Sequence, residues 1–266
     1  MSSLALSRPK EVLKPKRRLP ATAARTASLV ERLLAAWDAN SGVDAGASFE
    51  LSALALASDP LLPALFAASP LRLELLTETG ETLWTVNEAS LPGLWLVCPQ
   101  TGQASSGAWQ LELARCPARI AIHAATAGRP HRTMPQDPPA PGLAELWAGL
   151  RQSLTAGLGE TRVFNLSVPV LDPEAGCALT QALGAAAVLG RLEGQFLRQI
   201  ASTRWQRVWR VQYRDANARV QLDTLEIGVL PECAAASATE LAGTVLRLRA
   251  LVRGEPGETQ EGLGTP

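Results

Sequence analysis

Few side chains in this sequence could carry acid–base or metal chemistry, because its 266 residues include only 2 His and 4 Cys. His131 lies in a proline-rich stretch, which is a poor place to hold a catalytic base rigidly. His123 follows the apolar Ile120 and Ile122, and we interpret it as a structural histidine on a strand. Histidine-based catalysis is therefore not expected.

The cysteines show no metal-binding motif. Cys98, Cys116, Cys177 and Cys233 are isolated, and no Cys-x-x-Cys pair occurs. We expect them to be small buried hydrophobic residues, and we expect no metal and no cofactor. A cluster-loading role is an alternative that would require Cys98 and Cys233 to converge.

Two carboxylates, Asp223 and Glu226, interrupt an apolar hairpin strand. A carboxylate beside apolar strands can have a raised pKa and act as an acid or base. A solvent-facing position on an edge or bulge is the other interpretation, and the same choice applies to Glu232 after Pro231.

The sequence also lacks a phosphate-binding Gly-x-x-x-x-Gly-Lys-[Ser/Thr] loop and a Gly-x-Ser-x-Gly elbow. These patterns favour a protein that is not an enzyme.

Aromatic residues alternate along one hairpin strand at Trp205, Trp209 and Tyr213. Arginines are interleaved with them at Arg204, Arg207, Arg210 and Arg214. Trp, Tyr and Arg dominate the binding energy of protein interfaces, so this strand is a candidate docking surface. Burial of Trp209 and Tyr213 in a core is the alternative, and a core edge can also be a docking groove.

The composition predicts a globular protein, with 47% hydrophobic and 19% charged residues. Its 25 basic and 25 acidic residues give a formal net charge of zero, which argues against nucleic acid as a partner. No apolar run is long enough to cross a membrane, so we expect no membrane span and a cytoplasmic location.

Charge and proline content divide the chain into five segments. We predict a basic disordered arm (1–25), an N-terminal α+β lobe (26–125), a proline-rich linker (126–142), a C-terminal α+β lobe (143–253) and an acidic disordered tail (254–266). Apolar periodicity and capping residues predict helices over 27–39, 61–68, 143–154 and 178–189, and a terminal helix opened by the capping box Ser237 to Glu240.

The two lobes share a pattern. Phe49 to Pro60 and Phe164 to Pro173 each contain Leu-Ser, apolar residues and then Asp-Pro, with Asp as a helix N-cap. Trp95 and Trp209 are 114 residues apart, close to the 115 that separate the two Leu-Ser serines. We therefore predict two related lobes from a degenerate internal duplication, each a small, mostly antiparallel sheet with flanking helices. Chance similarity in an Ala- and Leu-rich chain is the alternative.

The second lobe has the clearest hairpin signal. Val208 to Tyr213 and Val220 to Ile227 are β-rich runs separated by turn residues. The apolar alternation of the return strand changes phase at Asp223 and Thr224, which predicts a β-bulge there.

This hairpin, the following Pro231 and Glu232 and the Ala-rich terminal helix resemble the C-terminal region of the HupH/HoxQ/HyaF family of [NiFe]-hydrogenase accessory proteins. The likeness extends upstream through Phe164 to Pro169 and weakly to Val86–Ala89 and Gly93–Val97. Gly194-Gln-Phe replaces a Gly-Tyr-Gly turn of the family, and Ala68-Ser-Pro replaces a Gly-Glu-Gly.

The resemblance implies a non-enzymatic chaperone that binds the precursor of the hydrogenase small subunit, the iron–sulfur subunit, before assembly and export. Other hydrogenase accessory proteins are further candidate partners. The alternatives are a scaffold for other maturation factors and an iron–sulfur or metal-loading factor that uses the cysteines. The residues expected to form the partner surface or to support it are Trp209, Tyr213, Asp223, Glu226, Pro231 and Glu232.

Overall fold

A computed structural model of the chain describes residues 28–40, 46–52, 55, 58–59, 61–100, 108–126, 134–155, 161–168 and 171–255. The arm predicted at 1–25 lies outside these residues, as do His131 and nearly all of the predicted tail. The helices are α1 (Ser28–Ala39), α3 (Leu62–Phe66), α4 (Ala118–Thr126), the 3-10 helix η2 (Pro141–Leu143), α5 (Ala144–Thr155), α6 (Pro173–Leu183) and α7 (Ala238–Arg253). The strands are β1 (Ala47–Leu51), β2 (Leu71–Leu76), β3 (Thr82–Glu88), β4 (Leu94–Pro99), β5 (Trp109–Leu113), β6 (Arg162–Asn165), β7 (Val188–Leu192), β8 (Leu197–Ser202), β9 (Val208–Arg214) and β10 (Val220–Ile227).

The described strands form one antiparallel sheet in the order β1-β5-β4-β3-β2-β7-β8-β9-β10-β6. At its centre β2 pairs with β7, from Leu71 opposite Leu192 to Leu75 opposite Val188. The predicted α+β class is confirmed. The prediction of one small sheet per lobe is wrong, because the pairing of β2 with β7 joins the strands of both lobes into a single sheet.

We call β1 to β5 the first half of the sheet and β6 to β10 the second half. Each half has a helix, a strand, a second helix and then a four-stranded meander whose last strand pairs with the first strand. The Trp95 indole donates to the carbonyl of Ala114 at 2.8 Å, and the Trp209 indole donates to that of Gly228 at 3.0 Å. The repeated order accords with the duplication, whose evolutionary origin stays a prediction.

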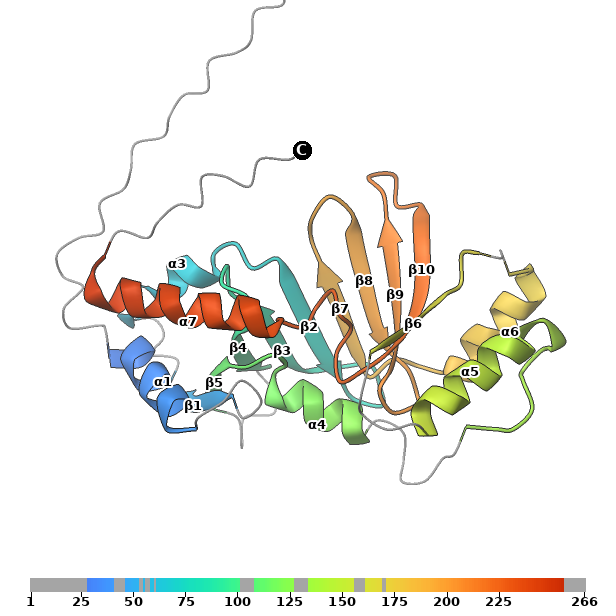
Figure 1. Cartoon of the computed structure of the whole chain (residues 1–266), viewed down its shortest axis with the longest axis horizontal. Coiled ribbons are helices and arrows are strands. Elements are labelled where there is room, and N and C mark those ends of the chain that lie inside the picture. The colour runs from blue at the N-terminus through green and yellow to red at the C-terminus, as the bar shows by residue number, and fades with distance from the viewer. Residues whose placement is uncertain are drawn as a thin grey trace, which may run out of the picture.

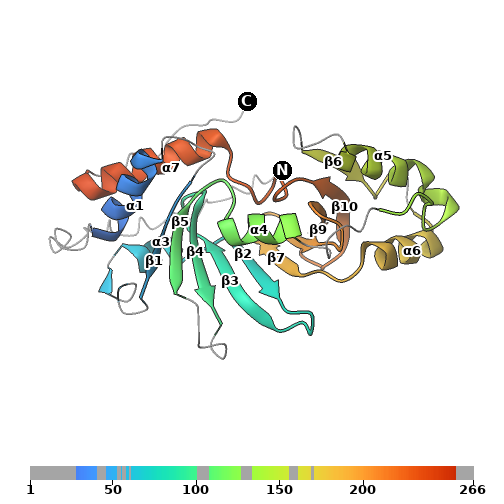
Figure 2. The same ribbon diagram turned by 90° about the horizontal axis from the view of Figure 1, so that it is seen from below.

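Hydrophobic cores lie on both faces of the sheet, beneath the helices that flank it; Figure 1 shows these helices. On one face, which we call the outer face, α1, α3 and α7 cover the first half, while η2, α5 and α6 cover the second half. On the opposite, inner face, α4 and the segment 230–236 cover the central strands. Figure 2 shows α4 between the two groups of helices. The outward-facing residues of β9 and β10 therefore lie beside α6.

The last helix packs against the first half of the sheet, although it follows the second half in sequence. Leu241, Val245 and Leu248 of α7 are buried in the same core as α1. The predicted capping box is confirmed, because the Ser237 hydroxyl accepts the Glu240 N–H and the Glu240 carboxylate accepts the Ser237 N–H. None of the described helices has the length and apolar character needed to cross a lipid bilayer.

Two local predictions are wrong. His123 lies in α4, not on a strand, because Ile120 and Ala124 are spaced by one helical turn and both face the inner core. The helix predicted at 178–189 is α6, which already begins at Pro173 after the N-cap Asp172, while Val188 belongs to β7.

The predicted bulge is also displaced. The register of β9 and β10 shifts between Val220 and Leu222, before Asp223. The change of apolar phase has another cause, since β10 is covered on both faces: Leu225 is buried in the outer core, while Thr224 on the opposite face pairs with Val211 of the inner core.

Candidate partner-binding site

The six residues predicted to bind or support a partner lie on β9 and β10 or just after them, but they do not face the same way. The inner face holds Trp209, Tyr213 and Glu226, the outer face holds Asp223, and the segment after β10 holds Pro231 and Glu232. These residues therefore form a supporting core, a partly buried position at Asp223 and an exposed position at Glu232, not one continuous patch.

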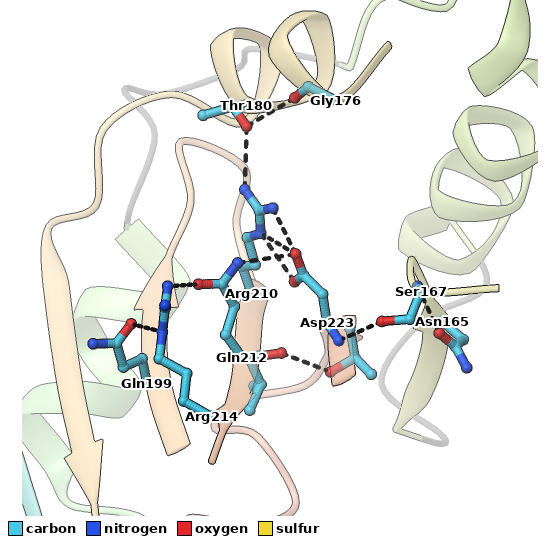
Figure 3. Close-up of polar contacts among 11 residues, drawn as sticks. Asn165, Ser167, Gly176, Thr180, Gln199, Arg210, Gln212, Arg214 and Asp223 are labelled. Atoms are coloured by element: carbon cyan, nitrogen blue, oxygen red, sulfur yellow. Dashed lines mark hydrogen bonds and ion pairs between the residues drawn. The ribbon is translucent and has the colours of Figure 1, made fainter. Parts of the chain in front are cut away.

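On the outer face, Asp223 is the acceptor of a dense hydrogen-bond network (Figure 3). Arg210 donates to its carboxylate from Nη2 at 2.6 Å and from Nε at 3.0 and 3.2 Å, and Gln212 Nε2 donates at 2.9 Å. The side chains of Arg210 and Asp223 retain 26% and 14% exposure. This ion pair is thus held mostly out of water, where charge-assisted hydrogen bonds are stronger than on an open surface.

The network reaches the neighbouring elements on both sides. Arg210 Nη1 donates to the hydroxyl of Thr180 on α6 at 3.2 Å. Arg214 donates to Gln212 Oε1 at 2.9 Å and to Gln199 Oε1 on β8 at 2.7 Å. The network consequently fixes the side chains of β9 against α6 and β8, and it keeps the outer face of these strands polar.

The main chain of Asp223 anchors the residues that follow β6. Its N–H donates to the Ser167 hydroxyl at 2.8 Å, and its carbonyl accepts the Leu166 N–H at 2.8 Å. Asn165 Oδ1 accepts the Ser167 N–H at 2.8 Å, which closes a tight turn. The Phe164-Asn-Leu-Ser segment is thereby held next to the Arg210–Asp223 pair.

A pocket of about 420 Å³ opens beside this network. Its walls come from β9, β10, α6 and the residues after β6, and Figure 3 shows Arg210 and Asp223 between α6 and Ser167. The lining residues are Leu166, Ser167, Leu171, Gly176, Leu179, Arg210, Val220, Gln221 and Asp223. The pocket combines aliphatic walls with the ion pair of Arg210 and Asp223, whose charges balance each other.

On the inner face, Trp209 and Glu226 are part of the core, with 1% and 3% exposure. Glu226 accepts hydrogen bonds from the Thr224 hydroxyl at 3.3 Å and the Glu232 N–H at 3.0 Å. Burial raises the pKa of Glu226, and these two hydrogen bonds partly oppose that effect. Both side chains therefore fix the segment after β10, in which Pro231 is buried while Val229 and Glu232 are exposed.

Tyr213 and Cys233 form a half-buried pair at the edge of the inner core. The Tyr213 hydroxyl is hydrogen-bonded to Cys233, and the Arg198 guanidinium lies 5.4 Å from the Tyr213 ring centre. Burial, followed by the nearby charge of Glu226, raises the pKa of the Cys233 thiol to about 11. Burial also raises the pKa of Tyr213 to about 12. Neither group is activated as a nucleophile, because both stay protonated at neutral pH.

The cysteines of the metal-loading alternative do not converge. Cys98 is buried in the core of α1 and α7 on the outer face, whereas Cys233 packs against the core on the inner face. Burial raises the pKa of Cys98 to about 11, which disfavours the thiolate that would bind a metal. Within the described ranges, no three His, Cys, Asp or Glu residues are placed to hold a metal ion together.

Residues 141–254 match the conserved C-terminal region of the HupH hydrogenase expression protein. The chain is 32% identical over 175 residues to the hydrogenase expression/formation protein HupQ of Azotobacter chroococcum mcd 1, covering 64% of this chain and 62% of HupQ. It is 30% identical over 174 residues to the hydrogenase expression/formation protein HoxQ of Azotobacter vinelandii, with the same coverage. A solved structure of the hydrogenase expression protein HupH from Thiobacillus denitrificans is 25% identical, with a TM-score of 0.35, and the match covers 42% of this chain and 91% of that one.

The resemblance seen in the sequence is confirmed: residues 141–254 match the C-terminal region of the HupH hydrogenase expression protein, and the chain is similar to two hydrogenase expression/formation proteins. The chain spans about 62% of the length of the two curated relatives. The Arg210–Asp223 network and the pocket both lie within the matched region.

Sequence reasoning missed most of the residues that surround Asp223. Arg210 was noted only as one of the interleaved arginines, while Gln212 and Thr180 gave no signal, because their roles depend on the register of β9 and the placement of α6. A usable signal was present at Arg210. It lies on the opposite side of the strand from Trp209 and Val211, and a charged residue there needs a partner on the next strand.

Proposed function

We propose that this chain is a non-enzymatic chaperone of [NiFe]-hydrogenase maturation that binds the small-subunit precursor in the cytoplasm before assembly and export. The observation that carries the proposal is the match of residues 141–254 to the conserved region of hydrogenase expression proteins. Two relatives named as hydrogenase expression/formation proteins support a role in hydrogenase maturation.

The geometry of the matched region favours binding over catalysis. The carboxylate of Asp223 accepts hydrogen bonds from Arg210 and Gln212, and that of Glu226 accepts them from Thr224 and the N–H of Glu232. A general acid or base needs a carboxylate that can reach a substrate proton. Because both carboxylates are engaged in internal hydrogen bonds, Asp223 shapes the pocket wall and Glu226 supports the core.

In this proposal the outer face of the second half binds the precursor. Asp223 sits at the wall of the pocket together with Arg210, and both contribute polar surface to the partner. Tyr213 and Glu232 lie on the other side of the sheet and would meet a partner that wraps around β10. Trp209, Glu226 and Pro231 act as support, since they are buried.

The proposal is tested by pulling down the tagged chain from hydrogenase-expressing cells and quantifying the small-subunit precursor by immunoblot. Asp223→Ala should reduce the recovered precursor by about tenfold or more, as loss of a well-packed polar anchor does. Glu74→Ala is the matched control, because Glu74 forms an ion pair with Arg72 at 2.9 Å on the outer face of β2. It should leave recovery unchanged.

Two results would contradict the proposal: no precursor on the wild-type chain, or equal recovery with Asp223→Ala while that variant remains folded. A scaffold for other maturation factors is distinguished by repeating the pull-down without the precursor. A chaperone then loses the other factors, whereas a scaffold retains them.

A further inference from the structure

Among the residues that the structure describes, the outer edge of β10 is unpaired for part of its length. β6 pairs with β10 only from Thr224 to Ile227, and the main-chain contacts of Leu166 and Ser167 extend this pairing to Asp223. In the part of the chain that the structure describes, no strand lies beyond Val220–Leu222 on the side away from β9. The edge of β10 therefore ends in a segment that can pair with another extended chain.

The pocket lies directly beside this open edge. Val220 and Gln221 belong to the edge and also line the pocket, next to Asp223. Val220 is 41% exposed, and Val168, which follows the pocket residue Ser167, is 73% exposed. Val220 is thus an exposed aliphatic side chain on the pocket wall, and covering it would remove apolar surface from water.

We propose that an extended segment of the hydrogenase small-subunit precursor adds to the open edge of β10 and places an aliphatic side chain in this pocket. This inference rests on the proposed function and names the docking mode for it. Addition of a peptide strand to a sheet edge uses main-chain hydrogen bonds for affinity and side-chain pockets for specificity.

The chemistry of the site selects this occupant. An extended chain can pair with the main-chain donors and acceptors of a sheet edge and a helix cannot, and the register shift between Val220 and Leu222 limits this pairing to a few residues. The walls Leu166, Leu171, Leu179 and Val220 favour an aliphatic side chain. Because Arg210 and Asp223 neutralise each other, the pocket has no free charge to reward a charged one. Alternate residues of the added strand would point to the outer face, where the pocket lies.

A glycine of the pocket provides a clean way to block it. Gly176 lines the pocket and lies on the same side of α6 as Leu179 and Thr180, three and four positions later. A Cβ added at Gly176 would meet no atom within 4 Å. The Cβ of Gly176→Leu is therefore accommodated, and the rest of the side chain should occupy part of the pocket. Leucine also favours a helix more than glycine does, so the variant is expected to fold.

Gly243→Leu is the matched control. Gly243 lies in α7, which packs against the first half of the sheet, whereas the pocket belongs to the second half. An added Cβ at Gly243 would likewise meet no atom within 4 Å. The two variants make the same chemical change in a helix, and only one of them places it at the pocket.

The test measures binding of the purified full-length precursor, and of overlapping peptides that span it, to the wild-type chain and both variants. We expect Gly176→Leu to weaken precursor and peptide binding at least about tenfold, Gly243→Leu to leave both unchanged, and the bound peptides to share an aliphatic residue. Amide hydrogen exchange should slow at Val220 to Leu222 in the complex.

The outcomes separate the two proposals. If the precursor binds but Gly176→Leu has no effect, or exchange at Val220 to Leu222 is unchanged, the docking mode is overturned while the proposed function stands. If the precursor does not bind the wild-type chain, both are overturned.

Discussion

In the first half of the sheet, the outward side chains of β4 are apolar, and Leu96 and Cys98 are packed beneath α1 and α7. In the second half, the topologically equivalent positions on β9 hold Arg210 and Gln212, which bind Asp223 beside an open pocket. Helices cover the outer surface of both halves, but in the second half they leave a polar cluster beside a pocket. We therefore place the proposed precursor-binding surface on the second half.

The inner faces of the two halves are alike. Trp95 lies opposite Glu112 and Trp209 opposite Glu226. Each glutamate accepts a main-chain N–H shortly after its strand, from Ala118 at 2.7 Å and from Glu232 at 3.0 Å. Burial raises the pKa of both glutamates. What the halves share builds the fold, so Trp209 and Glu226 are better understood as framework than as contact residues.

The largest expected effect comes from breaking the shared framework. Trp95→Ala and Trp209→Ala should each lower the free energy of unfolding by about 3–5 kcal/mol, because each removes a buried indole and its hydrogen bond. Urea denaturation followed by circular dichroism measures both losses. Similar values would support equivalent roles, whereas a near-neutral Trp209→Ala would reassign Trp209 to a surface role.

A smaller effect is expected from removing the charge pair that distinguishes the second half. Asp223→Ala should cost about 2–3 kcal/mol, because it leaves Arg210 partly buried without its carboxylate. The double variant Arg210→Leu with Asp223→Leu imitates the apolar first half and should recover part of this loss. A double-mutant cycle on unfolding free energies measures the coupling, and strict additivity would refute an energetic link between the two residues.

The smallest effect concerns a titratable group present only in the first half. Burial, partly opposed by the hydrogen bond from the Gly93 N–H, raises the pKa of Glu88 from 4.5 to about 7, whereas the equivalent position opposite Trp209 is Ser202. The folded chain therefore holds a proton between pH 4.5 and 7 that the unfolded chain releases, and stability falls as the pH rises through this window.

Glu88→Gln keeps an acceptor for the Gly93 N–H and removes the charge. It should raise the free energy of unfolding by about 1–2 kcal/mol at pH 8 and leave it unchanged at pH 4. Unfolding curves at the two pH values test this, and an equal effect at both would show that titration of Glu88 is not the cause.

Local signals predicted much of the fold. The amphipathic stripe of α1, the capping box of α7 and the hairpin of β9 and β10 depend on neighbouring residues and are confirmed. The joining of β2 to β7 could not be predicted, because the apolar inner side of a strand does not specify which strand lies next to it. The packing of α7 against α1 likewise depends on contacts between distant parts of the chain.

The candidate site was predicted in part for the same reason. Asp223 stood out because a carboxylate interrupted an apolar strand, yet its partners Arg210 and Gln212 are defined only by strand register. The aromatic pattern pointed to Trp209, but the alternation of aromatic and charged residues along β9 could not show whether the aromatic side chains are exposed or buried. Both faces of β9 are covered, so its aromatic face is part of a second core.

The measurement that tests the central claim most directly is the dissociation constant of the purified small-subunit precursor for the wild-type chain and for the Arg210→Leu, Asp223→Leu double variant. The account predicts that the double variant remains folded and binds the precursor at least about tenfold more weakly, because the outer face of its second half then resembles that of the first. An unchanged dissociation constant in the folded double variant would contradict the assignment of precursor binding to this face.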